Sequence, residues 1–565
     1  MTRTHATVAA LTFACVSAVA LLQGQGRAGP EWTTSGSDAQ RTGWVRTDSR
    51  ISVDRMLKPG PFGPFKFLWK LKLEYDPKAA TTLTQPILLN NVIGFRGFKS
   101  IVFVATASGT VHAIDYDVGE PLWKYHINYT ASPPPLIVGT AECPAGMTAA
   151  PSRPTAIAPS TTAGRGFGGA RGGRSGGGVG EPGKGATTLA TAGQLRGGPG
   201  LAPGAPAGRG AAGGAVPGSA AAAAGNQPGG LPGGARAGGL GGGGFGGGPF
   251  VPGDDAAYVV GTDGYLHALN VQNGWDNMTP ALFLPANTRP SGLIIATTED
   301  QGAVAYAATT HGCGSQPDAV WAMDLGSPQK TVTAFKVGAA TIAGSSGATI
   351  GRDGTVYVAT KDGSAPTSNS LFALEPKTLK RKASATVPRA NFTSSPLVFT
   401  WKDKDAILIG GAGKLYIFDP ASLGATPLAE SPSLGAADFE AGALASWTDA
   451  QQTRWVAAPT ARGVTTFKLV EQDGKPAFQA GWTSREIPSP LPPLVVNGVV
   501  FASSMGTRTA PAVLYALDAA TGKELWNSGR TMTSTVRGGL AAGQGNVYVP
   551  GTDSTLYAFG FEIEK

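Results

Sequence analysis

Few residues in this chain have the types and the spacing that catalysis or metal binding would require. Its 565 residues include five His and three Cys. His311 lies close to Cys313, but a zinc site needs three or four such ligands rather than two. His112 and His267 stand at equivalent places in the similar stretches "TVHAID" and "YLHALN", where packing explains them. The sequence therefore predicts no metal site, and it leaves the catalytic residues unassigned.

Two short glycine patterns match known catalytic or binding motifs by chance. Gly164, Gly166 and Gly169 form a G-x-G-x-x-G pattern, and residues 173–177 form a G-x-S-x-G pattern. The first binds a dinucleotide and the second presents a serine nucleophile only between a strand and a helix. Both lie inside a Gly-rich tract that predicts neither element. We infer no function from them.

The first 28 residues have the pattern of an export signal. Arg3 precedes the short apolar run 6–22, and small residues suited to cleavage follow near Ala28. The run is shorter than the ~20 residues that span a bilayer, and no later segment is long enough, so we expect no transmembrane span. An uncleaved anchor is the alternative. Removal of the signal leaves Cys143 and Cys313, a pair that can form a disulfide in an oxidising compartment.

The elements that would position any functional residue are repeated hairpins. A β-rich run, a turn with Gly, Asp, Ser or Asn, and a second β-rich run recur along the chain. From Asn270 to Gly560, successive copies end 42 to 54 residues apart, which is the period of β-propeller blades. The eight copies span residues 102–123, 256–270, 303–324, 354–375, 406–419, 454–468, 499–518 and 546–560.

The two ends of the chain complete one blade between them. Each hairpin has an apolar run before it and an outer run after it, which gives four strands per blade. The last hairpin lacks an outer strand, whereas residues 67–74 form an outer-strand sequence without a hairpin. Pairing them removes two exposed strand edges. The sequence therefore predicts an all-β, eight-bladed β-propeller of four-stranded blades, closed by an N-terminal strand.

This arrangement brings the two remaining cysteines onto one face of the ring. Cys143 lies where the first blade crosses to the second, and Cys313 lies in the hairpin turn of the third. Connections of these two kinds emerge on the same face of a propeller, and the blades are close neighbours. We therefore expect a disulfide between Cys143 and Cys313.

The stretch 514–526 resembles the tryptophan-docking motif of pyrroloquinoline-quinone (PQQ) repeat propellers, A-x-D-x-x-x-G-K-x-x-W. Residues 31–44 also resemble the N-terminal segment of such proteins. In that family the Trp packs between neighbouring blades, so the resemblance implies a structural role for the matching residues and for the Trp of the unpaired outer strand. These residues are Ala516, Asp518, Gly522, Lys523 and Trp526, then Ala113, Asp115, Gly119 and Trp123, with Glu120 in place of Lys, and Trp69. In the middle blades Met278, Val332, Ala383, Pro427 and Pro476 stand where the Trp is expected.

The resemblance implies two functions of different classes. Alcohol dehydrogenases of this family hold PQQ with a disulfide between adjacent cysteines, a stacking Trp and a calcium ion. This chain has no adjacent cysteines, no C-x-x-C-H haem motif and no calcium ligands that we can assign. We therefore predict a binding or scaffold protein that holds an unknown protein or ligand on a propeller face, with no assigned cofactor. The alternative is a divergent dehydrogenase that uses PQQ with calcium.

A long insert carries most of the positive charge. Residues 158–252 are rich in Gly, Pro and Ala, a composition that buries too little apolar surface to fold, so we expect disorder. Between residues 146 and 252 eight basic residues face one acidic residue, which accounts for most of the net charge of +8. The insert resembles single-strand-binding tails, but a tether, a contact with anionic surfaces or an idle insertion fits an exported chain better. We expect no nucleic-acid partner.

The expected organisation is a signal peptide (1–28), the start of the propeller (29–157), the insert (158–252) and the rest of the propeller (253–565). The start comprises the closing strand, the first blade and an inner strand of the second blade near residues 146–155, after which the insert interrupts that blade. We expect a secreted or periplasmic monomer.

Overall fold

The computed structural model describes residues 32–61, 63–75, 82–94, 97–127, 143, 146–157, 255–297, 302–361, 366–424, 426–436, 439 and 441–562. The predicted signal peptide and the predicted insert lie outside these residues. The chain divides into a unit of residues 1–165 and 248–565, which holds the propeller, and a unit of residues 166–247, which lies wholly outside the described part.

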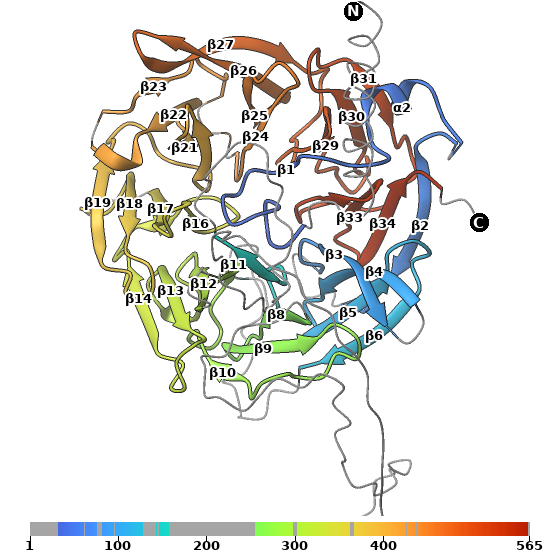
Figure 1. Cartoon of the computed structure of the whole chain (residues 1–565), viewed down its shortest axis with the longest axis horizontal. Helices are drawn as coiled ribbons and strands as arrows, with labels where there is room; N and C mark the ends of the chain where they lie inside the picture. The colour runs from blue at the N-terminus through green and yellow to red at the C-terminus, as the bar shows by residue number, and fades with distance from the viewer. Residues whose placement is uncertain are drawn as a thin grey trace, which may run out of the picture. The chain divides into compact units, whose positions relative to one another are not determined.

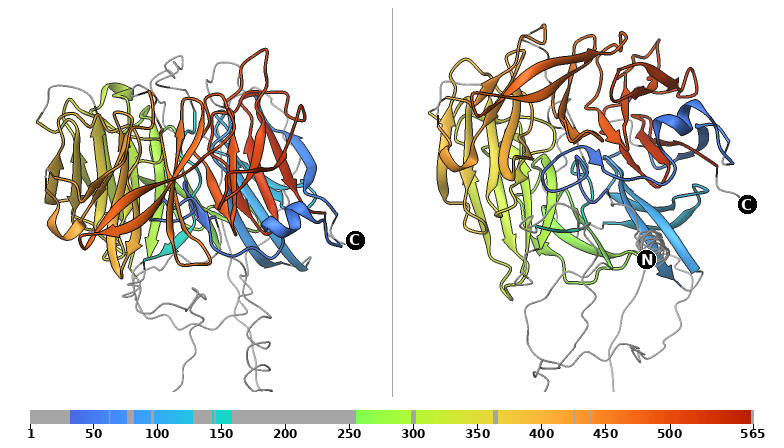
Figure 2. Two further views of the ribbon diagram at one scale, coloured as in Figure 1. Left: turned by 90° about the horizontal axis from the view of Figure 1, so that it is seen from above. Right: turned by 45° about the horizontal axis from the view of Figure 1, so that its top comes forward.

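The described residues form eight β-sheets arranged around a ring (Figure 1). This confirms the predicted eight-bladed propeller. In the edge-on view of Figure 2 the strands run between two opposite faces, which carry the connections. Because strands that follow one another within a blade are antiparallel, connections of one kind always emerge on the same face.

Blades one to four contain the following strands. Blade one has β3 (Ile87–Gly94), β4 (Gly97–Ala105), β5 (Thr110–Asp115) and β6 (Pro121–His126); blade two has β8 (Ala256–Val260), β9 (Tyr265–Asn270) and β10 (Ala281–Leu282); blade three has β7 (Pro154–Ala156), β11 (Pro290–Thr297), β12 (Ala303–Thr309), β13 (Ala319–Asp324) and β14 (Val332–Lys336); blade four has β15 (Thr341–Ile342), β16 (Thr349–Ile350), β17 (Val356–Lys361), β18 (Ser370–Leu374) and β19 (Arg381–Thr386).

Blades five to eight follow in chain order. Blade five has β20 (Leu397–Trp401), β21 (Lys404–Gly411), β22 (Lys414–Phe418) and β23 (Ala429–Glu430); blade six has β24 (Ala445–Thr448), β25 (Arg454–Thr460), β26 (Gly463–Gln472) and β27 (Lys475–Thr483); blade seven has β1 (Trp44–Val45), β28 (Leu494–Val496), β29 (Val499–Ser503), β30 (Leu514–Asp518) and β31 (Glu524–Asn527); blade eight has β32 (Ala541–Gly543), β33 (Asn546–Pro550), β34 (Thr555–Gly560) and β2 (Lys66–Lys72). The described helices are short: α2 (Val53–Leu57), η1 (Cys313–Ser315) and η2 (Pro420–Ser422).

The N-terminal strand closes the ring, as predicted. β2 pairs antiparallel with β34, and the register runs from Lys66 opposite Gly560 to Lys72 opposite Thr555. The largest apolar cluster lies at this junction and joins blade eight to blades one and seven. Burial of this surface is the main force that holds the first and last parts of the chain together.

A second N-terminal segment, Trp32–Val45, lies inside the ring (Figure 1), and we call it the axial segment. Its backbone carbonyls accept hydrogen bonds from backbone N–H groups beside or within the innermost strands of six blades. The bonds are Leu88 to Trp32 (2.9 Å), Arg153 to Thr33 (2.8 Å), Ile350 to Ala39 (2.9 Å), Val398 to Gln40 (3.0 Å), Ser446 to Thr42 (2.9 Å) and Val495 to Gly43 (2.8 Å). The segment therefore satisfies inner-edge donors that the blades cannot satisfy themselves.

The structure differs from the prediction at the inner edge of blade two. Around residues 146–155 we expected a strand of blade two, but only Ser152 bridges Tyr258 of that blade. The next residues form β7, which pairs in parallel with β11 of blade three. The bond from Arg153 to the axial segment fixes the chain at this crossing. Blade two consequently has a three-stranded sheet.

Among the described residues, no helix has the length and apolar character needed to cross a membrane.

Candidate functional site

Two of the predicted docking tryptophans lie against glycines of the next blade. A Cβ atom added to Gly119 would lie 2.5 Å from Cδ2 of Trp69, and one added to Gly274 would lie 2.6 Å from Cε3 of Trp123. Both glycines have positive φ, 71° and 76°, which other residues rarely adopt. The Nε1–H group of Trp123 also donates to the carbonyl of Val271 (2.9 Å). These contacts join neighbouring blades.

The acidic and small residues of the motif shape the turn that receives the ring. Oδ1 of Asp518 accepts the N–H of Ala520 (2.7 Å), and the Asp518 carbonyl accepts the N–H of Gly522 (2.8 Å). Asp115 bonds in the same way to the N–H groups of Asp117 and Gly119, each at 3.0 Å. Ala113 and Ala516 are fully buried opposite Trp123 and Trp526 in the strand ladder. Small side chains leave room there for the indole rings.

Trp482 has a docking role that the sequence pattern did not reveal. A Cβ atom added to Gly522 would lie 2.5 Å from Cε3 of Trp482, and Nε1 of Trp482 donates to the carbonyl of Ala519 (2.9 Å). The expectation that Pro476 replaces the docking Trp of blade six was therefore wrong. Strands β26 and β27 are longer than their counterparts, so the Trp lies farther from the hairpin turn than the motif spacing predicts.

Trp526 packs differently from the other docking tryptophans. Its ring meets Phe65 edge-on at 4.9 Å between centroids and contacts Phe559 at 5.5 Å. Phe65 precedes the closing strand β2, so Trp526 packs against the junction of the two chain ends.

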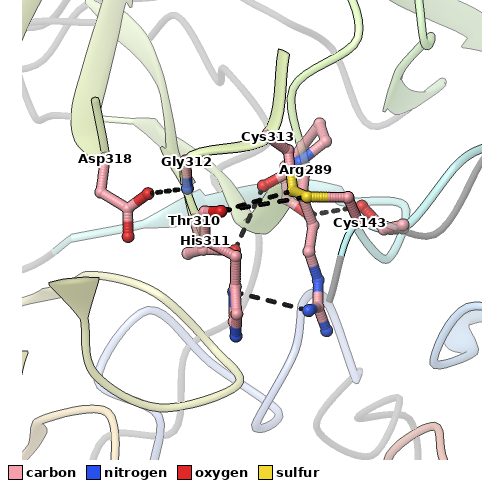
Figure 3. Close-up of a disulfide and its surroundings, with 9 residues drawn as sticks. Cys143, Arg289, Thr310, His311, Gly312, Cys313 and Asp318 are labelled. Carbon is pink, nitrogen blue, oxygen red and sulfur yellow. Dashed lines mark hydrogen bonds between the residues drawn. A yellow bond between two sulfur atoms is a disulfide. The ribbon is translucent and has the colours of Figure 1, made fainter. Parts of the chain in front are cut away.

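The structure joins Cys143 to Cys313 through a disulfide bond, and their Cα atoms lie 5.6 Å apart (Figure 3). Asp318 braces the loop that carries Cys313. Its Oδ1 atom accepts the N–H of Gly312 (2.7 Å), and its Oδ2 atom accepts the N–H of Ile342 in blade four (2.9 Å). The disulfide thus connects the crossing after blade one to a loop already fixed between blades three and four.

The axial segment contains a buried arginine that binds backbone oxygens. Arg41 is 3% exposed, and its guanidinium donates to the carbonyls of Ala348 (3.1 Å), Gly292 (2.7 Å) and Ser35. Burial lowers the pKa of Arg41 to about 9, with Asp38 acting in the opposite direction. Arg41 therefore fastens the axial segment to blades three and four.

The two histidines at equivalent positions are buried strand residues. His112 lies in β5, and burial lowers its pKa to about 4, with the charges of Glu74 and Lys124 acting in opposite directions. His267 lies in β9, and its Nδ1 atom is 3.0 Å from Oδ2 of Asp276. Both side chains are buried, which agrees with a packing role.

An open cleft of about 590 Å³ lies between blades seven and eight, and we call it the blade 7–8 cleft. It lies on the face of the ring that carries the β29–β30, β31–β32 and β33–β34 connections. The disulfide joins connections of the same two kinds and therefore lies on the same face. Its lining residues are Gly506, Thr507, Arg508, Thr533, Ser534, Thr535, Arg537, Thr552 and Asp553. This set of hydroxyl and guanidinium groups can bind an anionic or strongly polar group.

Hydrogen bonds between the loops hold the walls of the cleft in place. The N–H of Val536 donates to the Met505 carbonyl (2.9 Å), and the N–H of Ala512 donates to the Ser534 carbonyl (3.1 Å). The Oγ1 atoms of Thr535 and Thr552 lie 2.7 Å apart. The cleft is therefore a preformed feature of the ring.

The residues present do not fit the quinone clamp that the family resemblance implies. That clamp needs adjacent cysteines, whereas Cys143 and Cys313 are 170 residues apart and bonded to each other. Within the described part of the chain, no group of three or more His, Cys, Asp or Glu side chains is arranged to hold a metal ion. We derive no chemical step through PQQ or calcium.

Comparisons with known proteins confirm the resemblance to quinoprotein-like propellers. A family model described as outer membrane protein assembly factor BamB matches residues 452–562. No curated protein matches the chain.

Among solved structures, a europium-containing methanol dehydrogenase has a TM-score of 0.51 at 10% identity and covers 96% of this chain and 100% of its own. Quinohemoprotein alcohol dehydrogenase from Comamonas testosteroni has a TM-score of 0.49 at 13% identity, covering 96% and 82%. BamB from Moraxella catarrhalis has a TM-score of 0.36 at 15% identity, covering 55% and 95%. At 10% identity the likeness to the europium-containing methanol dehydrogenase shows the fold and not the activity.

Proposed function

We propose that this quinoprotein-like β-propeller is an exported binding or scaffold protein that holds its ligand or partner at the blade 7–8 cleft. The observation that carries the proposal is the cleft itself, an open volume of about 590 Å³ with two arginines and several hydroxyl groups on its walls. Concave sites of roughly 300–1,000 Å³ with a few convergent polar groups are typical ligand sites.

The way in which the ring is built supports a binding role. β2 and the axial segment both fasten the N-terminal part to blades formed much later in the chain. A site on a rigid platform loses less conformational entropy when it binds, because its groups are already in position. The loop-to-loop bonds around the cleft provide this rigidity where binding would occur.

The proposed location is the periplasm or the outside of the cell. The leader-like residues 1–28 support export, and a disulfide between Cys143 and Cys313 is the kind of bond that persists in oxidising compartments. We propose that the protein is a monomer. We propose no nucleic-acid partner, since the positive charge lies mostly outside the repeats.

Site-specific photo-crosslinking in an exporting host tests this function. A photoreactive residue at Thr533, an exposed cleft residue, should give a discrete adduct. The same residue at Lys475, which is exposed at the start of β27 beside the β26–β27 turn on the opposite face, serves as the control. Equal labelling at the two positions, or no adduct at Thr533, would contradict binding at the cleft.

A PQQ-dependent dehydrogenase with a divergent active site is the second candidate. The likeness in fold to the europium-containing methanol dehydrogenase favours it, whereas the missing clamp of adjacent cysteines does not. The visible absorption spectrum after addition of PQQ and calcium separates the two. A dehydrogenase would perturb the quinone bands at stoichiometric protein, and a binding protein of the proposed kind would leave them unchanged.

A further inference from the structure

We propose that the blade 7–8 cleft recognises a small molecule through a carboxylate or phosphate group. This inference rests on the proposed function in taking the cleft as the binding site, and it adds the chemical class of the ligand. Its basis is two guanidinium groups without a carboxylate partner and one hydroxyl group without a hydrogen-bond partner among the described residues.

The two arginines of the cleft have no carboxylate partner among the described residues. Arg537 donates from Nη1 to the carbonyl of the adjacent Val536 (3.2 Å), and Arg508 makes no ion pair there. Both side chains belong to exposed residues that line the cleft. A guanidinium presents paired donors that match the oxygens of a carboxylate or phosphate. An anionic group in the cleft would therefore find two suitable partners.

The single acidic residue of the lining is already neutralised by other groups. The carboxylate of Asp553 lies 3.3 Å from Nζ of Lys72 in β2 and accepts the hydroxyl of Thr555 at 3.0 Å. Burial raises the pKa of Asp553, but the bonds from Thr555 and the charge of Lys72 outweigh it, so its pKa lies below the ordinary value. Asp553 is thus committed to Lys72, and the cleft remains positive.

The hydroxyl groups of the cleft include one without a partner. Ser534 is 9% exposed and lines the cleft, and its buried Oγ atom makes no hydrogen bond in the structure. A buried polar atom without a partner is unfavourable. The neighbouring hydroxyls are engaged, since Thr533 contacts the Tyr557 hydroxyl (3.1 Å) and Thr535 contacts Thr552. The Oγ atom of Ser534 lies beside Gly551, so a bound anion would satisfy it once the side chain turns toward the cleft.

The shape of the cleft favours a small molecule over a peptide. Its volume of about 590 Å³ suits a compact ligand. Backbone hydrogen bonds at Met505, Ser534 and Thr535 join the loops around it, which holds the walls at this spacing.

Isothermal titration calorimetry of the purified full chain tests the proposal with two probes, citrate for the carboxylate and glycerol 3-phosphate for the phosphate. We expect saturable binding of at least one probe. Arg508→Gln and Arg537→Gln should each weaken binding by about tenfold or more, since each removes a charge-assisted interaction. Ser534→Ala should weaken it by about threefold to tenfold. Increasing salt should weaken binding of the wild-type chain by screening.

Arg530→Gln is the matched control, because Arg530 is an exposed arginine in the same β31–β32 connection and does not line the cleft. It should bind as the wild type does. All variants should keep the wild-type circular dichroism spectrum and melting temperature. Absence of binding of both probes at millimolar concentration would overturn the proposal, and so would equal affinity of the Arg508 and Arg530 variants.

Binding of an acidic peptide without either small probe would also overturn it. In that case the adduct at Thr533 would still form. This result would support binding at the cleft and contradict a small carboxylate or phosphate ligand. Absence of the adduct together with citrate binding that depends on Arg508 would support the ligand class and contradict the capture of a partner at the cleft.

Discussion

The contact between Trp482 and Gly522 allows a quantitative test of how the blades are held together. A Cβ atom at position 522 would lie 2.5 Å from Cε3 and 2.6 Å from Cδ2 of the indole, and φ of Gly522 is +72°. Gly522→Ala thus combines two costs, about 1–2 kcal/mol for the left-handed backbone and about 1–3 kcal/mol for the steric overlap. We expect the free energy of unfolding to fall by about 3 kcal/mol.

Gly474→Ala separates these two costs. Gly474 has a φ of +76° in the turn after β26, and a Cβ atom there would meet no atom within 4 Å. It should therefore carry the backbone cost alone, about 1–2 kcal/mol. Trp482→Ala should cost about 3 kcal/mol, near the lower end of the range for Trp truncation because the ring is only partly buried.

The double variant completes the test. Once Trp482 is truncated, Gly522→Ala should cost only about 1–2 kcal/mol, because its clash partner is gone. Chemical denaturation followed by tryptophan fluorescence and circular dichroism measures all four variants. If Gly522→Ala costs no more than Gly474→Ala, or if truncating Trp482 gives no relief, the docking explanation is wrong.

Three further predictions concern the same framework. Cys313→Ser should lower stability by about 2–4 kcal/mol, and thiol labelling of the unfolded, unreduced wild-type chain should find no free thiol; two free thiols would exclude the disulfide. Arg41→Met should lower stability by about 3–5 kcal/mol, because the carbonyls of Ala348, Gly292 and Ser35 lose their buried charged donor, and a change below 1 kcal/mol would show that Arg41 does not fasten the axial segment. Excision of residues 160–250 should shift the melting temperature by only a few degrees, since that composition buries little apolar surface; a large drop would show that the insert packs.

The sequence indicated the parts of the fold that repeat locally. Hairpin spacing predicted the eight blades, and the unpaired stretch around Trp69 predicted the strand that closes the ring. The axial segment was harder to predict, because its own residues lie outside the hairpin repeat and bond to six blades. The period shows only on the blade side, where Ile350, Val398, Ser446 and Val495 are 48 to 49 residues apart. Trp482 was missed because longer strands in blade six shifted it away from the motif spacing.

The cleft could not be predicted from spacing either. Arg508 and Arg537 come from different connections, and Asp553 comes from a turn of the next blade. No motif relates these three positions, since only the packing of blade seven against blade eight brings them together. The long hairpin connection around Arg508, with its hydroxyl residues, was the one available signal.

Dye reduction with PQQ and calcium tests most directly whether the protein binds or catalyses. The full mature chain is incubated with both, and a set of alcohols and sugars is offered with an artificial electron acceptor. PQQ acts as an effective oxidant only when its carbonyls are polarised and its ring is held, and the adjacent-cysteine clamp for that task is missing from this chain. We predict no substrate-dependent reduction above that of free PQQ and calcium. Reduction at enzyme-like rates, about 1 s⁻¹ or faster, would contradict the binding function and establish the dehydrogenase.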